Sequence, residues 1–186
     1  MDRRIKYTQK VIKETFLELI KDKEIKKVTI SEICEIADIN RATFYRYYTD
    51  VYDLLDKIEE EFVTELKEAT SKINNDYSVA KFTNTILTVF LDNKRLVKIL
   101  FSTKNITALL SEVLEIAYIK CKEKWENDLK TLSNEDIEYA SLFIFNGALG
   151  IINFWVQNDF NKNTNEIAAV IEQLSYFGTK RFIYKK

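Results

Sequence analysis

Two arginines, a threonine and three tyrosines occur within the short stretch from Arg41 to Tyr48. An arginine guanidinium can hydrogen-bond the edge of a guanine through two donors, and a threonine or tyrosine hydroxyl can meet a base or a phosphate oxygen. The chemistry that this stretch offers is therefore recognition by hydrogen bonding.

The residues that an enzyme of this size commonly uses are missing. The sequence contains no His, which excludes His-based acid–base catalysis and His metal ligands. It has no glycine-rich phosphate loop, and Cys34 and Cys121 both lie in helical patterns, which favours buried thiols over a disulfide or a redox pair. Carboxylate-only chemistry stays open, but Glu59, Glu60 and Glu61 point in different directions on a helix. We expect no enzyme, no cofactor and no metal site.

The elements that position the Arg41–Tyr48 stretch can be read from its flanks. Thr29 and Glu32 have the spacing of a capping box, in which each side chain bonds the backbone amide of the other. The helix that starts there is interrupted around Asp38, and Asn40 is a good N-cap for a second helix over Arg41–Tyr48. Two short helices joined by a tight turn, the second rich in donors, are typical of a helix-turn-helix.

Small and turn-forming residues agree with this interpretation. Cys34 lies one turn before the break, where the two helices must approach closely. Asp38 tolerates a left-handed backbone better than most residues, so it can turn the chain. On the second helix we expect Ala42 and Phe44 to form the inner face. Ala42 is also expected to lie next to DNA.

A set of residues within about the first 55 carries a resemblance to a known family. The set is Thr8, Ile12, Phe16, Leu19-Ile20, Val28-Thr29-Ile30, Glu32-Ile33, Ala37-Asp38-Ile39-Asn40 and Thr43-Phe44-Tyr45-Arg46-Tyr47-Tyr48. With these residues the N-terminal part of the chain resembles the DNA-binding domain of the TetR family of transcriptional regulators. Two positions depart from the family pattern. Asp38 replaces the usual turn glycine, and Val51 stands where many members have a phosphate-binding lysine.

The resemblance and the side-chain chemistry together imply roles on double-stranded DNA. We expect Arg41 and Thr43 to read bases, Tyr45 and Tyr47 to bind phosphates, and Thr29 to anchor the backbone. Half-buried packing of the two tyrosines is the alternative. The full predicted DNA-binding set is Thr29, Asn40, Arg41, Ala42, Thr43, Tyr45, Arg46 and Tyr47.

Composition favours an all-α protein, because the 186 residues include no Pro and 3 Gly and are 46% hydrophobic. We expect a helix-turn-helix domain over residues 1–50 and a helical regulatory and dimerisation domain over residues 51–186. Beyond the motif, helices are predicted at about 4–21, 51–73, 78–90, 105–129, 134–157 and 165–183. The charged N-terminus is not signal-like, which predicts a cytoplasmic protein.

The stretch Tyr139–Phe160 is similar to the C-terminal domain of TetR regulators related to those of dihydroxyacetone-kinase operons. Its helix has about the length of a short membrane span, but polar residues and two glycines interrupt it, and we expect a helix buried on nearly all sides. A symmetric homodimer formed by the last two helices would cover its second apolar face. The residues predicted at this interface are Ile144, Gly147, Ala148, Ile151, Trp155, Ile171 and Leu174.

A ligand pocket is expected inside the second domain, although filling of the core is the alternative for each residue. The predicted lining is Phe62, Leu66, Phe82, Leu87, Phe90, Phe101, Leu110, Tyr118 and Phe143. The aromatic content of 13% without any His favours a small apolar effector over a metal chelate. We therefore expect a dimeric repressor that binds a palindromic operator and is released by such an effector. The alternative is a regulator that acts mainly through a protein partner.

Overall fold

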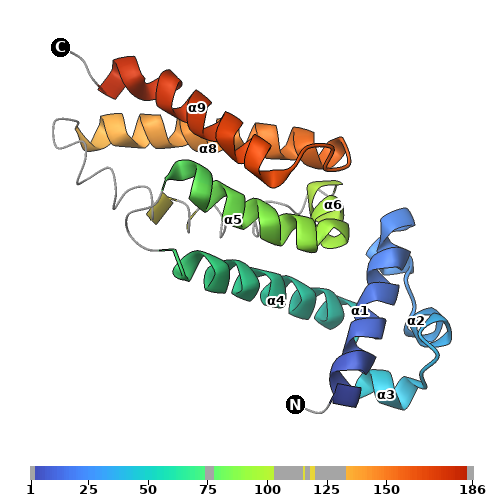
Figure 1. Cartoon of the computed structure of the whole chain (residues 1–186). Coiled ribbons are helices and arrows are strands. Elements are labelled where there is room, and N and C mark those ends of the chain that lie inside the picture. The colour runs from blue at the N-terminus through green and yellow to red at the C-terminus, as the bar shows by residue number, and fades with distance from the viewer. Residues whose placement is uncertain (1–2, 74–77, 103–114, 116–117, 120–132, 184–186) are drawn as a thin grey trace. The chain divides into compact units, whose positions relative to one another are not determined.

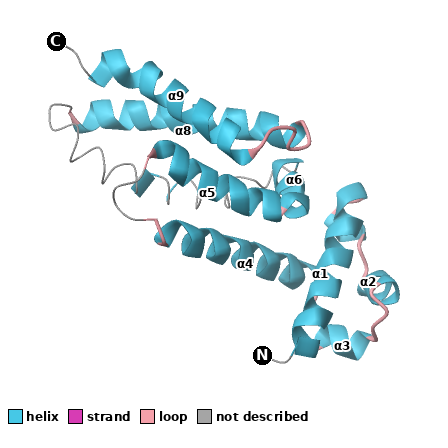
Figure 2. Cartoon of the chain, in the orientation of Figure 1, coloured by secondary structure: helices cyan, strands magenta, loops and turns pink. Residues whose placement is uncertain are grey.

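Helices make up every element of the computed structural model, which describes residues 3–73, 78–102, 115, 118–119 and 133–183 (Figures 1 and 2). The predicted all-α fold is confirmed. The chain divides into two compact units, Met1–Phe62 and Val63–Lys186, which meet within one helix. The sequence placed the domain boundary earlier, before Val51. Most of the predicted helix at 105–129 lies outside the described residues.

The first unit contains α1 (Arg3–Asp22), the short 3-10 helix η1 (Ile25–Lys27), α2 (Ile30–Ile36), α3 (Arg41–Tyr45) and the first part of α4 (Val51–Ser71). Its core takes large apolar side chains from each α-helix. The side chains of Ile12, Phe16, Ile33, Phe44 and Leu54 are all fully buried. Both α1 and α3 pack against this core, so the burial of Ile33 and Phe44 fixes the two short helices that could not persist alone.

Polar side chains mark where these helices begin, as the sequence predicts. The Thr29 hydroxyl accepts from the Glu32 amide at 3.3 Å, and the Asn40 side-chain oxygen accepts from the Thr43 amide at 2.8 Å. The Glu32 carboxylate, however, pairs with Lys23 instead of reaching back to Thr29. This ion pair links the first turn of α2 to the segment that precedes the helix and stabilises the start of α2.

The second unit contains the rest of α4, α5 (Val79–Asp92), α6 (Lys94–Ser102), α8 (Asn134–Gln157) and α9 (Thr164–Ile183). Helix α9 packs against both α5 and α8, and α6 packs against α8 (Figure 1). The Glu172 carboxylate of α9 accepts from the Ala80 amide at 3.0 Å and so caps the start of α5 from another helix. Ser78 and Ser133 cap α5 and α8. The side chain of Asn163 caps the start of α9.

Helix α8 corrects the expectation of a helix buried on nearly all sides. Within the described part of the chain, α8 is the single helix that is long and apolar enough to cross a membrane. Only 28% of its most apolar 18-residue stretch is buried, however. Length and composition alone are weak grounds for a membrane span, because a helix that packs in a soluble protein passes the same test. One face of α8 packs within the unit, and on its other side large apolar side chains such as Phe143 and Phe154 are exposed.

Candidate nucleic-acid interface

The turn between α2 and α3 has the geometry that the sequence predicts. Asp38 adopts a left-handed backbone with φ of 51°. The Ile39 amide donates to the Cys34 carbonyl at 3.0 Å, and the Asp38 amide donates to the Glu35 carbonyl at 3.3 Å. These two bonds form a Schellman motif, which ends α2 and satisfies its last carbonyls. Cys34 is buried beside this turn, and burial raises the pKa of its thiol.

Helix α3 separates an anchored face from an exposed face. Phe44 is fully buried and lies edge-on to Tyr45, with ring centroids 5.9 Å apart. Arg41, Ala42 and the 56% exposed Tyr45 face solvent. The exposure of Ala42 corrects its predicted place on the inner face, because Phe44 alone reaches the core from this short helix. The exposed face therefore presents a cation, a methyl group and a phenol.

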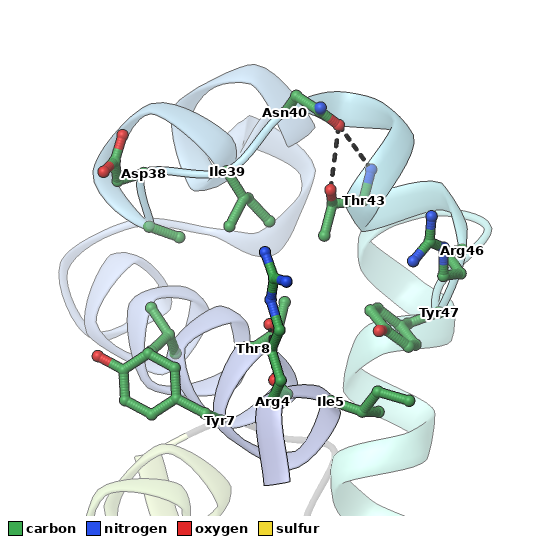
Figure 3. A pocket seen from close by; sticks show the side chains of 12 residues that line it. Arg4, Ile5, Tyr7, Thr8, Asp38, Ile39, Asn40, Thr43, Arg46 and Tyr47 are labelled. Atoms are coloured by element: carbon green, nitrogen blue, oxygen red, sulfur yellow. Dashed lines mark hydrogen bonds between the residues drawn. The ribbon is translucent and has the colours of Figure 1, made fainter. Parts of the chain in front are cut away.

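The remaining polar residues of the predicted set are half-buried or engaged. Thr43 and Tyr47 are half-buried, whereas Arg46 is exposed. The Thr43 hydroxyl donates to the Asn40 side-chain oxygen at 3.1 Å, so this cap also orients the threonine (Figure 3). A guanidinium nitrogen of Arg41 donates to the Ser31 hydroxyl of α2. The motif thus holds Arg41 across the turn without burying its charge.

A lysine on α4 fastens the chain that follows α3. Lys57 Nζ donates to the Tyr47 carbonyl at 2.9 Å and to the Asp53 carboxylate at 3.0 Å. The same carboxylate accepts from the Thr49 amide at 2.8 Å. The hydrogen bond from the Thr49 amide, and then the hydrogen bond from Lys57, hold the pKa of Asp53 below its usual value. Asp53 and Lys57 form a latch that the sequence analysis missed, and their i,i+4 spacing was the available signal.

A groove of about 870 Å³ lies in the same unit. It opens between the first turns of α1, the α2–α3 turn, Thr43 of α3 and the two residues Arg46 and Tyr47 that follow that helix (Figure 3). The residues that line it are Arg4, Ile5, Tyr7, Thr8, Val11, Ala37, Asp38, Ile39, Asn40, Thr43, Arg46 and Tyr47. Four members of the predicted DNA-binding set are among them, and the α1 residues were not in that set.

The residues predicted for a ligand pocket lie in different surroundings. Phe62, Leu66, Phe82, Leu87 and Phe90 are buried, and Phe62 belongs to the first unit. Phe101 is half-buried, with its ring centroid 6.2 Å from that of Phe90, and Tyr118 is half-buried 6.3 Å from Phe145.

Two predicted pocket residues, Phe143 and Leu110, do not line an interior pocket among the described residues. Phe143 is 63% exposed on α8, which corrects its assignment to an interior pocket. Its ring lies against Gly178 of α9, where an added Cβ would approach to 3.0 Å, so it covers a helix surface instead of lining a cavity. Leu110 lies outside the described residues.

Three of the predicted interface residues are buried within the second unit, which corrects the choice of faces on α8 and α9. Ile144, Trp155 and Ile171 are at most 8% exposed. The Trp155 indole donates to the Lys162 carbonyl at 2.8 Å and lies edge-on to Phe160 at 4.8 Å. These contacts fix the connection to α9 and leave no indole surface for a partner. Ala148 and Ile151 are half-buried, and Gly147 and Leu174 are exposed.

The described residues contain no group of three or more His, Cys, Asp or Glu side chains placed to hold a metal ion. The chemistry of the first unit is instead that of an all-helical scaffold that presents a short, donor-rich helix after a tight turn. This arrangement defines the class of helix-turn-helix proteins.

Comparison with known proteins narrows this class to a family. Residues 77–176 match a TetR family described as "Transcriptional regulator C-terminal region". The chain belongs to the TetR family of transcriptional regulators. A stretch of 61 residues is 34% identical to the HTH-type transcriptional regulator YxbF of Bacillus subtilis (strain 168). That match spans 33% of this chain and 15% of the length of YxbF.

Solved structures share the fold across nearly the whole chain. A TetR-family transcriptional regulator from Syntrophomonas wolfei is similar with a TM-score of 0.69 and 17% identity, over 96% of this chain and 95% of that one. The dihydroxyacetone kinase operon activator DhaS is similar with a TM-score of 0.64 and 18% identity, over 93% and 96%. The fatty acid degradation regulator FadR from Bacillus halodurans gives 0.63 and 16%, over 89% and 96%. At these identities the likeness shows the fold alone.

Proposed function

We propose that this regulator is a cytoplasmic homodimeric repressor, which binds a palindromic DNA operator and releases it when a small apolar effector binds the second unit. The observation that carries the DNA part is the exposed face of α3, held by the Asp38 turn, the Asn40 cap and the buried Phe44. A rigid short helix with donors on its free side fits the major groove, where its N-terminal residues meet base edges.

Arg41, Ala42 and Tyr45 are the residues best placed to read bases, because all three are exposed on α3. Arg46 and Tyr47 come after α3 and line the groove of the protein beside it, where they suit contacts to DNA phosphates. Thr29 and Asn40 contribute mainly as caps, since their side-chain oxygens accept backbone amides. Their position at the starts of two adjacent helices still leaves Thr29 beside the DNA backbone in this proposal.

The dimer is supported by exposed apolar side chains on the last two helices. On α8, Phe143 and Phe154 are 63% and 69% exposed, and on α9, Leu174 and Phe177 are 57% and 67% exposed. Soluble monomers rarely leave large apolar side chains grouped on one surface, and such groups mark interaction sites. Two helices from each copy would bury them in a four-helix interface with two-fold symmetry.

The glycines of α8 fit the same proposal. A Cβ added at Gly147 or Gly150 would meet nothing within 4 Å among the residues that the structure describes. Packing within the unit therefore does not require glycine at either position. Close approach of a helix from a second copy supplies a reason for the missing side chains, and the two-fold axis would set the α3 helices about one DNA turn apart, ~34–36 Å.

The effector proposal is supported by α5. Its buried face carries Phe82, Leu87 and Phe90, which offer an apolar surface. The Asn84 side-chain oxygen is buried without a hydrogen-bond partner in the part of the chain that the structure describes. Such an acceptor costs stability unless a donor reaches it. An apolar effector with one donor group would supply this donor.

Replacing Asn84 should therefore test the effector site. Asn84→Leu should abolish binding of the effector, whereas the control Thr88→Val, on the exposed side of α5, should not.

The experiment that tests DNA binding starts with the full-length protein and random duplex DNA. Repeated selection should return a palindromic sequence with half-sites one helical turn apart, and gel shifts should show that one dimer binds each site. Deletion of the gene should raise expression of the promoter that carries the recovered site. Recovery of no preferred sequence contradicts the DNA part, and a fall in expression contradicts repression.

Effector binding is tested by thermal unfolding in the presence of apolar compounds, followed by release of operator DNA. A compound that changes DNA affinity 100-fold must prefer the free conformation by about 2.7 kcal/mol. The alternative is that the second unit binds a protein partner. A partner that co-purifies with the full-length chain and alters operator binding, with no stabilising compound found, would replace the small effector.

A further inference from the structure

The groove of the first unit brings side chains of α1 beside those of α3. Arg4 and Thr8 come from the first turns of α1, and Thr43, Arg46 and Tyr47 come from α3 and the residues that follow it. Figure 3 shows the Arg4 side chain extending from α1 into the space that Thr43 and Asn40 border. Two cations on separate elements therefore face one concavity of about 870 Å³.

We propose that this groove holds a backbone phosphate of the bound DNA, with Arg4 as the cation that α1 contributes to the nucleic-acid interface. This inference rests on the proposed DNA binding and adds a second element to it. A guanidinium matches the geometry of a phosphate through two parallel N–H donors, and Arg46 adds a second positive charge. Asp38 is the carboxylate among the lining residues, so the lining as a whole is positive.

The position of the groove relative to α3 favours DNA as the source of the phosphate. Thr43 and Tyr47 line it, whereas Arg41, Ala42 and Tyr45 do not. When the exposed face of α3 enters the major groove of DNA, the face beside it lies next to a strand of the backbone. Arg4 then meets the strand from the side opposite to the bases, where it fixes the register of α3 without reading the sequence.

The charge at the start of α1 gives an independent reason for an anionic partner. Helix α1 begins with Arg3 and Arg4 and has no acidic residue in its first turn. Cations at this end of a helix oppose the helix dipole and destabilise it. The Thr8 hydroxyl donates to the Arg4 carbonyl at 2.9 Å within this turn. A phosphate near Arg4 would add an anion at this end of the helix and favour the first turn in the bound state.

The test uses the full-length protein, the operator recovered by selection and an unrelated duplex of the same length. Arg4→Gln should weaken binding to both duplexes by the same factor, about tenfold at low salt. It should also make the slope of log affinity against log salt less negative by about 0.9 for each subunit bound. Arg4→Lys should retain the slope, because it keeps the charge. Lys21→Gln is the control, since it removes the same charge from the far end of the same helix.

Phosphate ethylation interference locates the contact. In each half-site, ethylation of one particular phosphate should block binding of the wild-type protein but not of Arg4→Gln. Ethylation of the other interfering phosphates should block both proteins. If Arg4→Gln matches Lys21→Gln in affinity, slope and interference, the inference is overturned although DNA binding stands. If the wild-type protein binds neither duplex, the proposed function itself fails.

A free anion is the other source of the same chemistry. Inorganic phosphate at millimolar concentration, followed by amide NMR of the DNA-free protein, distinguishes the two sources. Shifts at groove residues that vanish in Arg4→Gln, together with unchanged DNA affinity of that variant, would overturn the DNA assignment in favour of a small anion. A thermal midpoint of Arg4→Gln no lower than that of the wild-type protein would exclude misfolding as the cause of any loss.

Discussion

The Tyr48 side chain has a ring whose burial is favourable and a hydroxyl whose burial is unfavourable. The residue is 2% exposed, its ring lies 5.5 Å from that of Phe44, and Lys57 Nζ lies 5.4 Å from its centroid. Its hydroxyl, however, has no hydrogen-bond partner in the described part of the chain. Burial, with the nearby carboxylates of Glu61 and Asp53, raises the pKa of Tyr48, so the hydroxyl stays neutral. The ring stabilises the first unit, and the hydroxyl pays a desolvation penalty.

Replacing Tyr48 by Phe should therefore increase stability. Loss of an unpartnered buried hydroxyl removes a penalty of about 1–3 kcal/mol, of which we expect about 1 kcal/mol to appear in the free energy of unfolding. Denaturant unfolding of both proteins measures the difference. The control Tyr45→Phe changes an exposed tyrosine and should alter stability by less than about 0.5 kcal/mol. A loss of more than about 1 kcal/mol in Tyr48→Phe would show that the hydroxyl has a partner.

Arg41 should determine one base of the operator. It donates to Ser31 in the free protein and must exchange this bond for a guanine edge on binding. Arg41→Ala should cost about 1–3 kcal/mol of binding free energy and relax specificity at one position in each half-site. Tyr47→Phe should instead weaken all sequences alike. Affinities for operators with each base pair changed in turn provide the measurement, and an unchanged profile for Arg41→Ala would remove Arg41 from the readout.

Single residues were predictable where the chemistry is local. The left-handed backbone of Asp38 and the caps at Thr29 and Asn40 depend on neighbours within a few residues, and the sequence shows those neighbours. The burial of Tyr48 and the exposure of Ala42 depend on which helix packs where, which local spacing does not contain. The prediction for Ala42 failed for that reason.

At the scale of elements, the latch on α4 should control how firmly α3 is held. Lys57→Met removes the donor to the Tyr47 carbonyl and keeps an apolar stem of similar length. We expect a loss of about 1 kcal/mol, reduced by the partial exposure of the side chain, and faster amide exchange from Phe44 to Thr49. Hydrogen-exchange mass spectrometry measures the second effect. Lys67→Met, an exposed change on the same helix, is the control, and equal exchange in both variants would show that the latch is passive.

Helix positions were easier to predict than helix faces. Capping residues placed the starts of α2 and α3 correctly, because caps act within one turn. On α8, apolar residues surround the helix, so periodicity could not show which face packs inside the unit. The structure buries the face of Ile144 and Trp155 and leaves Phe143 and Phe154 exposed.

At the scale of the whole molecule, the exposed side of α8 should determine association. Phe154→Glu places a charge where a second copy is proposed to pack and should raise the Kd of the dimer by about 100-fold or more. Because Phe154 is 69% exposed, the fold of a single copy should persist. Sedimentation velocity at micromolar concentration measures the change, and circular dichroism checks the fold. Tyr52→Glu, at an exposed tyrosine of the first unit, should leave association unchanged.

A wild-type monomer under the same conditions would contradict the dimer. The exposed aromatic side chains of α8 and α9 would then require another cover, and the operator would need only a single half-site. The family and the all-helical fold would stand in that case, since neither depends on association.

The five-residue helix α3 also has a consequence for how such a regulator diverges. Its anchoring residue, Phe44, and its cap, Asn40, are separate from the exposed side chains of Arg41, Ala42 and Tyr45. Exposed substitutions usually change stability by less than about 0.5 kcal/mol. A duplicated gene could therefore acquire a new operator through a few codon changes at these three positions, with each intermediate still folded. Selection on the target sequence and selection on the scaffold then act on different residues of one short helix.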